Sequence, residues 1–311
     1  MHAMKRLVFA GSASPNIARA IAHKLGYRLG KSEKTVFANS ELKVTIFEKV
    51  EDANCVVVQS IVNPTNNNLV ELLFTIDALK REGATKVILV IPYFGYARQD
   101  IQHLPGECVS VNVIIKALEA LGSNKVITVD IHDEATAGVF TIPFRNVSVL
   151  PFIASLIRED LNQDLSSVVV GSPDQGGIER ARIFARALYG EIKEHDVITI
   201  EKKRTLTEVH KSKPLELFGT VKNKTVLLVD DVATSGGTVL QAADVCLEQG
   251  AINVIAAVVH ADFALGVPKR IQKSSISRWY TTNTVEATQE DLSVYPKISV
   301  LDISSIVSEN L

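Results

Sequence analysis

Two adjacent carboxylates stand at the end of an apolar run, directly before a turn rich in glycine and hydroxyl side chains. The apolar run is Val226–Val229, the acids are Asp230 and Asp231, and the turn is Thr234–Thr238 (Thr-Ser-Gly-Gly-Thr). The run predicts a buried parallel strand, and a helical pattern follows the turn over 238–249. This order predicts a phosphate site, because free backbone N–H groups and the helix dipole both point at the ligand.

The acid pair limits what this turn can bind. Carboxylates repel phosphate, so two of them favour sugar hydroxyls, or a cation that bridges to phosphate, beside the phosphate itself. The turn lacks the Lys of a Walker loop, and no G-x-x-x-x-G-K-[ST] occurs in the chain. An ordinary strand-to-helix turn would explain Gly236 and Gly237 alone, but not the acids together with them.

The stretch Val226–Thr238 resembles the phosphoribosyl-diphosphate (PRPP) motif of type I phosphoribosyltransferases and PRPP synthetases. In those families the turn binds the 5-phosphate of ribose, and the acids face the 2- and 3-hydroxyls. The resemblance implies that ribose 5-phosphate is bound by Asp230, Asp231, Thr234, Ser235, Gly236, Gly237 and Thr238. Thr234 stands where many members have Asp, which keeps a hydroxyl for phosphate and removes a negative charge.

Four further segments resemble the synthetases in particular. Aromatic residues around Gly and Arg in Tyr93–Asp100 could stack on a base and bind phosphate, or could simply form a packed turn. This segment is similar to the family's PYxxYxRQD. Asn67–Leu79, Asp130–His132 and Gly171–Gly177 are similar to its NDNLMELL…DAL helix, its DLH and its SPDxGG turn. Ordinary phosphoribosyltransferases are shorter and lack the segments Tyr93–Asp100, Asn67–Leu79 and Gly171–Gly177, so the resemblance is specific to the synthetases. It covers almost the whole chain.

This resemblance implies a reaction in which ATP and ribose 5-phosphate give PRPP and AMP, with the diphosphoryl group moving as a unit. The residues that it assigns to ATP binding are Phe37, Asn39, Ser40, Glu41, Arg98, Gln99 and His132. It also places His132 and Asp174 at the ATP–Mg²⁺ site, although the sequence around His132 alone favours an ordinary histidine at a domain edge. Sparse protein ligands suit Mg²⁺, which keeps phosphate and water ligands.

A charged segment opens at Glu201 and runs to about Gly219. Its plain interpretation is a solvated loop. In an extended segment, however, Lys202 and Arg204 point to the same side, and two cations on a closing flap could neutralise charge that develops during transfer. The family has a Lys-x-Arg pair in such a flap, so the resemblance makes Lys202 and Arg204 catalytic. The amino-acid sequence of this flap is similar to that of archaeal-type members of the family.

The chain departs from the family at the loop that contacts adenine. The family's F-x-D-G-E reads Phe-Ala-Asn-Ser-Glu over Phe37–Glu41. Phe37 can still stack on a base, and Asn39 can still form hydrogen bonds but offers no carboxylate. In the family this loop serves the neighbouring subunit, so the resemblance implies self-association with a shared active site.

Composition narrows the class of protein. The chain has 311 residues, a net charge of −2 and a pI near 6.4, which gives no electrostatic case for a nucleic acid or membrane partner. No apolar run reaches the roughly 18 residues that a membrane-spanning helix needs, and residues 4–13 are better interpreted as a first strand than as a signal peptide. Cys55, Cys108 and Cys246 show no metal or disulfide spacing, which favours the cytoplasm.

Short apolar runs alternate with amphipathic ones along the chain. The expected strands are 6–10, 55–59, 86–91, 125–130, 167–170, 197–200, 225–229 and 253–259. The expected helices are 14–24, 68–82, 110–121, 152–160, 178–188 and 238–249. Together with the resemblance, this alternation predicts an α/β protein of two related type I phosphoribosyltransferase-like domains, each a mainly parallel sheet flanked by helices. In such sheets ligands bind at the carboxyl ends of the strands.

An internal echo favours a duplicated fold. Residues 124–133 parallel residues 223–231, since both contain Asn-Lys, an apolar strand and then acids. With a boundary near 146–151, we expect an ATP-side domain over 1–146 and a ribose 5-phosphate-side domain over 147–311, which contains the PRPP motif and the flap. A last strand, 298–303, could belong to either domain.

Two other functions are compatible with parts of this pattern. A regulatory homologue would bind nucleotide without making PRPP, which the altered adenine loop favours and the Lys202–Arg204 pair opposes. A PRPP-consuming phosphoribosyltransferase would explain Asp230–Thr238 but would leave the Arg98 segment without a role.

Overall fold

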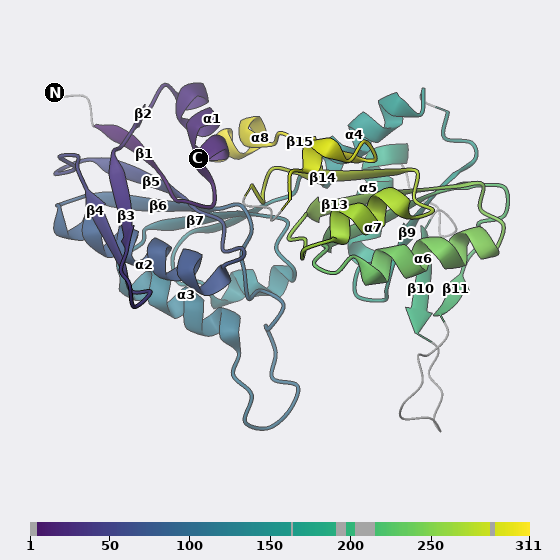
Figure 1. The fold of residues 1–311 in the computed structure, drawn as a ribbon, viewed down its shortest axis with the longest axis horizontal. Coiled ribbons are helices and arrows are strands. Elements are labelled where there is room, and N and C mark those ends of the chain that lie inside the picture. The colour runs from purple at the N-terminus through teal and green to yellow at the C-terminus, as the bar shows by residue number, and fades with distance from the viewer. Residues whose placement is uncertain (1–4, 163, 191–196, 203–214, 287–289) are drawn as a thin grey trace. The chain divides into compact units, whose positions relative to one another are not determined.

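The computed structural model describes residues 5–162, 164–190, 197–202, 215–286 and 290–311 (Figure 1). The chain forms two compact units. The first contains Met1–Ser148, Asn283–Ala287 and Asp302–Leu311, and the second contains Val149–Thr282 and Thr288–Leu301. Each unit is described by itself. Among the described residues, no helix is both long and apolar enough to cross a membrane.

The first unit is built on a six-stranded sheet with the order β2-β1-β5-β6-β7-β8, in which all neighbours are parallel. The strands are β1 (Arg6–Ala10), β2 (Arg28–Leu29), β5 (Asn54–Val58), β6 (Lys86–Ile91), β7 (Lys125–Val129) and β8 (Phe144–Val147). The helices are α1 (Pro15–Leu25), α2 (Thr65–Arg81), α3 (Ser110–Ala120), the 3₁₀ turn η1 (Glu134–Val139) and α8 (Ser304–Ser308). Runs such as Val56–Val58 are buried because helices cover the sheet.

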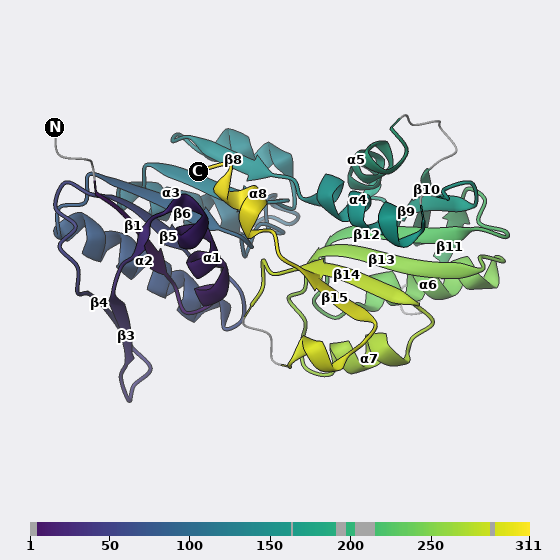
Figure 2. The same ribbon diagram turned by 90° about the horizontal axis from the view of Figure 1, so that it is seen from above.

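An antiparallel ribbon stands apart from this sheet (Figure 2). It consists of β3 (Ser32–Val36) and β4 (Leu42–Ile46), with Lys34 opposite Val44. The ribbon has no hydrogen-bonded strand neighbour in the six-stranded sheet, and β4 packs against α2.

The second unit has a seven-stranded sheet with the order β11-β10-β9-β12-β13-β14-β15. The strands are β9 (Val168–Ser172), β10 (Val197–Lys202), β11 (Leu215–Phe218), β12 (Thr225–Val232), β13 (Asn253–His260), β14 (Arg278–Thr282) and β15 (Ile298–Leu301). The helices are α4 (Leu150–Asp160), α5 (Ile178–Tyr189), α6 (Gly237–Glu248), α7 (Val267–Lys273) and the 3₁₀ turn η3 (Leu292–Val294). All described pairs are parallel except β10–β11.

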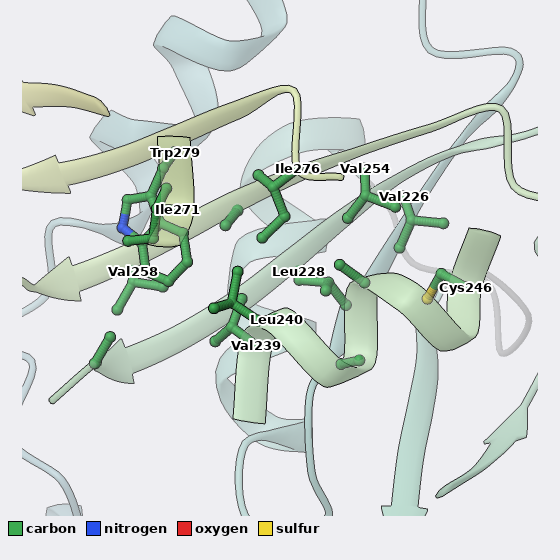
Figure 3. Packing of buried hydrophobic residues seen from close by; sticks show 14 of the residues in the cluster. Val226, Leu228, Val239, Leu240, Cys246, Val254, Val258, Ile271, Ile276 and Trp279 are labelled. Atoms are coloured by element: carbon green, nitrogen blue, oxygen red, sulfur yellow. The ribbon is translucent and has the colours of Figure 1, made fainter. Parts of the chain in front are cut away.

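Figure 3 shows how the core of this unit forms between helix and sheet. Val226 and Leu228 of β12 lie in one buried cluster with Val239 and Cys246 of α6, and Trp279 of β14 extends this cluster. The alternation of apolar residues along α6 puts these side chains on the helix face that covers the sheet. The core therefore holds α6 against the strand that ends in the acid pair.

The expected fold class is confirmed, and all of the expected strands and helices are present with small shifts at their ends. The division of the chain differs from the expected one at 146/147, because it falls after Ser148 and the segments 283–287 and 302–311 rejoin the first unit. There α8 packs on α1, and the Lys125 ammonium donates to the carbonyl of Asn310 at 3.0 Å. The last expected strand is β15, which belongs to the second unit.

The strand order shows that the similar sequences at 124–133 and 223–231 do not occupy equivalent strands of the two units. In both sheets the first strand of the unit lies between the second strand and a later one, so β1 and β2 correspond to β9 and β10, and β5 corresponds to β12. The echo instead pairs β7 with β12. The repeated sequence therefore matches two strands that hold different positions in their sheets, because the strand order makes β14 the counterpart of β7. The relation between the two units is carried by topology and not by that sequence similarity.

Candidate active site

The acid pair lies at the carboxyl end of β12, within the strand. Both residues are buried, with 8% of Asp230 and 4% of Asp231 exposed. Arg180 of α5 places Nη1 at 3.4 Å from Oδ1 of Asp230 and 3.3 Å from Oδ1 of Asp231. Burial raises the pKa of Asp230 well above its ordinary value, Asp231 raises it further, and Arg180 lowers it. One guanidinium thus compensates two neighbouring buried carboxylates.

The turn after the pair has the form that phosphate binding needs. Gly236 adopts a left-handed conformation (φ 68°) and precedes α6, which begins at Gly237. A Cβ on Gly236 would lie 3.3 Å from Val267 of α7, so both the backbone conformation and the space favour glycine there. Thr234, Ser235 and Thr238 are exposed. Three exposed hydroxyl side chains therefore lie at the start of a 12-residue helix, where the N–H of Gly237 donates to Oγ of Ser235 at 3.3 Å.

A second cation lies at this turn. Arg270 of α7 donates from Nη1 to the carbonyl of Ser235 at 3.3 Å, and the N–H of Ala264 donates to the carbonyl of Thr234 at 2.9 Å. These bonds fix the turn from the side of α7. Nothing local in the sequence marks Arg180 or Arg270 as a site residue, because each is separated from its partner by more than 30 residues.

Asp174 lies in the turn that follows β9. Its Oδ1 accepts from the N–H of Gly177 at 3.1 Å, and its carbonyl accepts from Ser172 Oγ at 2.6 Å. Because β9 pairs with β12 in parallel, the Asp174 turn and the acid pair lie at the same edge of the sheet. The structure thus places Asp174, Asp230, Asp231 and Thr234–Thr238 at one edge of the sheet of the second unit.

The flap falls mostly outside the described residues. Lys202 is the last residue of β10 and pairs with Leu215 of β11, while Arg204 lies outside the described part of the chain. β10 is the parallel neighbour of β9, with Thr199 opposite Ser172, so it runs three residues further toward the edge that holds Asp174. The backbone of Lys202 therefore belongs to the same edge as the acid pair.

In the first unit, the Tyr93–Asp100 segment follows β6. Phe94 is buried and meets Phe140 edge to face at 6.2 Å, so Phe94 is a packing residue, as in the packed-turn interpretation. A Cβ on Gly95 would lie 2.2 Å from the carbonyl oxygen of Ile61, which explains why the turn contains glycine. Arg98 is exposed beyond this packed turn.

The residues that follow β6 and β7 meet at one edge of the first sheet. Gln99 is exposed, and its Oε1 accepts from Ser110 Oγ at 2.5 Å. His132 is exposed after β7, behind a turn in which Asp130 Oδ1 accepts from Ser148 Oγ at 2.7 Å. Because β6 and β7 are parallel neighbours, the Arg98 segment and His132 share this edge.

The Phe37–Glu41 loop is the tip of the ribbon. Its hydrogen bonds run from the N–H of Phe37 to the carbonyl of Glu41 (2.9 Å) and from the N–H of Glu41 to Oδ1 of Asn39 (3.2 Å). Ser40 has a φ of 69°, a conformation that costs a residue with a Cβ about 1 kcal/mol. Phe37 is 46% exposed. The loop is therefore a closed turn that presents an aromatic ring to its surroundings.

No group of three metal-ligating side chains occurs among the residues that the structure describes. His132 of the first unit and Asp174 of the second unit are both exposed. Mg²⁺ is compatible with so few protein ligands, because phosphate oxygens and water complete its shell.

Comparison with known proteins covers nearly the whole chain. Residues 6–122 match the model of the N-terminal domain of ribose phosphate pyrophosphokinase, and residues 149–291 match the phosphoribosyl transferase domain. The chain is 37% identical to the ribose-phosphate pyrophosphokinase of Marinomonas sp. over 98% of this chain and 94% of that one. It is 34% identical to that of Thermosipho africanus over 97% and 92%. A crystal structure of phosphoribosylpyrophosphate synthetase from Mycobacterium smegmatis aligns with a TM-score of 0.89 and 30% identity, over 98% of this chain and 97% of that one.

Proposed function

The chain belongs to the ribose-phosphate pyrophosphokinase family, and we propose on this premise that it transfers the β,γ-diphosphoryl group of ATP to the 1-hydroxyl of ribose 5-phosphate. The products are PRPP and AMP, which serve nucleotide biosynthesis. The observation that carries this proposal is the buried acid pair beside the Thr234–Thr238 turn in a chain that matches pyrophosphokinases over almost its full length. The regulatory and phosphoribosyltransferase alternatives are not favoured, because the full-length relatives are named as pyrophosphokinases.

The second unit binds ribose 5-phosphate in this proposal. Asp230 and Asp231 accept hydrogen bonds from the 2- and 3-hydroxyls, and the Thr234–Thr238 turn donates to the 5-phosphate, aided by the dipole of α6. Arg180 pairs with both acids and offsets part of their negative charge. The sugar is thus held at both ends, which leaves its 1-hydroxyl oriented for attack on the β-phosphorus.

Phe37, Asn39, Ser40, Glu41, Arg98, Gln99 and His132 bind ATP in this proposal, and His132 and Asp174 provide ligands for Mg²⁺. Magnesium, when bound, neutralises phosphate charge. Lys202 and Arg204 then stabilise the charge that develops on the moving diphosphoryl group. The three free cysteines (Cys55, Cys108 and Cys246) are compatible with a reducing cytoplasm.

The reaction is tested by its nucleotide product. With Mg²⁺ and ribose 5-phosphate, ATP should give AMP and PRPP in equal amounts, measured by anion-exchange chromatography. Without ribose 5-phosphate, AMP release should stop. ADP as the main product would mean a simple kinase, and an absence of any product would favour the regulatory homologue.

We further propose that the protein self-associates and that the Phe37–Glu41 loop completes the active site of a second copy. The exposed Val36 and Phe37 at the ribbon tip support this, since apolar side chains at a tip suit contact with another chain. Mixing Glu41→Ala and Lys202→Ala proteins under subunit exchange should then restore activity that neither has alone. A fully active monomer in sedimentation would contradict the shared site.

We propose that Asn39 affects the choice between ATP and GTP. Because Oδ1 of Asn39 accepts from the N–H of Glu41, the Asn39 amide nitrogen is the group that can donate to a base. A donor suits the 6-oxo group of guanine, so GTP should be used measurably, though less well than ATP. Asn39→Asp restores a charged acceptor and should raise the ATP/GTP ratio of kcat/KM by about fivefold, since a charge-assisted hydrogen bond is roughly 1 kcal/mol stronger. An unchanged ratio would show that the backbone of the turn selects the base.

A further inference from the structure

The carboxylate of Glu71 is the centre of a buried polar cluster in the first unit. Glu71 lies on α2 and is 5% exposed. It accepts hydrogen bonds from the N–H of Ser12 (2.9 Å), from Nε2 of Gln59 (3.2 Å) and from the ammonium of Lys34 (2.9 Å). The hydroxyl of Ser12 also donates to it. A buried carboxylate is stable only with such partners, and here one of them is a full positive charge.

This cluster occupies the position that corresponds to the sugar site of the second unit. Asn54 begins β5 opposite Arg6 of β1, just as Thr225 of β12 lies opposite Val168 of β9. Counting five residues onward from Asn54 and from Thr225 reaches Gln59 and Asp230. Gln59 therefore stands where the second unit has the first acid of its pair.

The carboxyl ends of β1 and β5 are filled by the chain's own side chains. The N–H of Ala13 donates to Oε1 of Gln59 at 3.0 Å, and the N–H of Ser60 donates to Oγ of Ser14 at 2.9 Å. The N–H groups of Ala13 and Ser60 are thus both satisfied within the chain. These strand ends also hold the ammonium of Lys34.

Lys34 comes from the ribbon, three residues before Phe37. Its Nζ lies 2.9 Å from Glu71 and 2.5 Å from Oγ of Ser12, and 26% of its side chain is exposed. The ribbon forms a sheet of its own, so it has no backbone ladder to the main sheet. It is held by the partly buried face of β4 against α2 and, from β3, by this ion pair.

We propose that Lys34 is a positioning residue for ATP binding: its ion pair with Glu71 fixes β3 and so sets the place of the Phe37–Glu41 turn. This rests on the proposed role of the turn. Lys34 does not touch the nucleotide and acts by holding the strand that leads to Phe37. Its loss frees one side of the ribbon, while the apolar face of β4 stays in contact with α2.

The kinetic test compares Lys34→Met with Lys34→Arg and with Lys43→Met. Lys43 lies on β4 of the same ribbon, is exposed, and serves as the matched control. Lys34→Met should raise KM for ATP by about tenfold or more, because a small misplacement of a binding group is costly, and should leave KM for ribose 5-phosphate within about twofold. Lys34→Arg, which keeps the charge, should restore most of the ATP affinity, and Lys43→Met should behave as the unaltered protein. An equal rise in both KM values, or an unchanged KM for ATP, overturns the proposal.

A second measurement does not depend on activity. Phe37→Trp in a Trp279→Phe background places a single indole at the ribbon tip, and its fluorescence anisotropy reports local motion. Adding Lys34→Met should lower that anisotropy, and adding Lys43→Met should not. If Lys34→Met does not fold, Lys34→Gln, which is neutral but still a donor, takes its place with the same expectation. Unchanged anisotropy in Lys34→Met overturns the proposal that the Lys34–Glu71 ion pair fixes β3. Failure of the unaltered protein to make AMP and PRPP counts against the proposed function alone.

Discussion

Lys202→Ala should lower kcat by about 10²-fold or more, the usual scale for the loss of one preorganised charge donor. Lys202 ends β10 at the sheet edge that holds the acid pair and the Asp174 turn. The affinity for ATP should change much less, because a flap that closes only for the reaction contributes to the transition state and little to the ground state. Steady-state kinetics with both substrates varied measure the two effects.

Lys222→Ala is the matched control for this variant, since Lys222 is an exposed lysine in the same unit, just before β12. Its kcat should equal that of the unaltered protein. A Lys202→Ala enzyme with near-normal kcat would mean that the charged segment is a solvated loop and not a catalytic flap.

Arg180→Met should cost about 3 kcal/mol of folding free energy at neutral pH, because it removes a cation that pairs with two buried acids. Arg180 is the cation that pairs with both Asp230 and Asp231, and their side chains are only 12% and 5% exposed. Urea denaturation measures the loss. Arg182→Met on the same helix is the control, since Arg182 is 57% exposed and pairs with Glu179 at the surface, so its loss should cost little.

The loss of folding free energy in Arg180→Met should grow as the pH rises. Burial, followed by repulsion from Asp231, holds the pKa of Asp230 above its unfolded value, and Arg180 opposes this. Removing Arg180 raises that pKa further, so the folded variant binds more protons than the unfolded chain and loses stability as pH rises. The deficit should therefore be larger at pH 8 than at pH 5. A deficit that grows as the pH falls would contradict the charge-compensation role of Arg180.

Local patterns determined the parts of the molecule that lie within one strand, one turn and one helix. The acid pair, the Thr234–Thr238 turn and α6 were predicted together, because contiguous residues set the strand, the left-handed Gly236 and the helix start. The alternation of apolar runs likewise predicted parallel sheets covered by helices. These features need only short-range sterics and periodicity, which a sequence displays directly.

Other features follow from contacts between distant parts of the chain. The ribbon was not predicted, since its strands are half-exposed and carry polar residues, and the aromatic Phe94 proved to be part of a packed turn. Strand order, and not sequence similarity, showed that β5 is the counterpart of β12.

The sequence by itself determined the family, and it supplied the residues that we propose bind ribose 5-phosphate. Only the tertiary structure decided that Arg180 compensates the acid pair, and that Lys34 reaches Glu71 across 37 residues of sequence. A charged side chain carries no local sign of its partner. Its partner is chosen by burial, which makes an unpaired charge costly and which exists only once the strands and helices have packed.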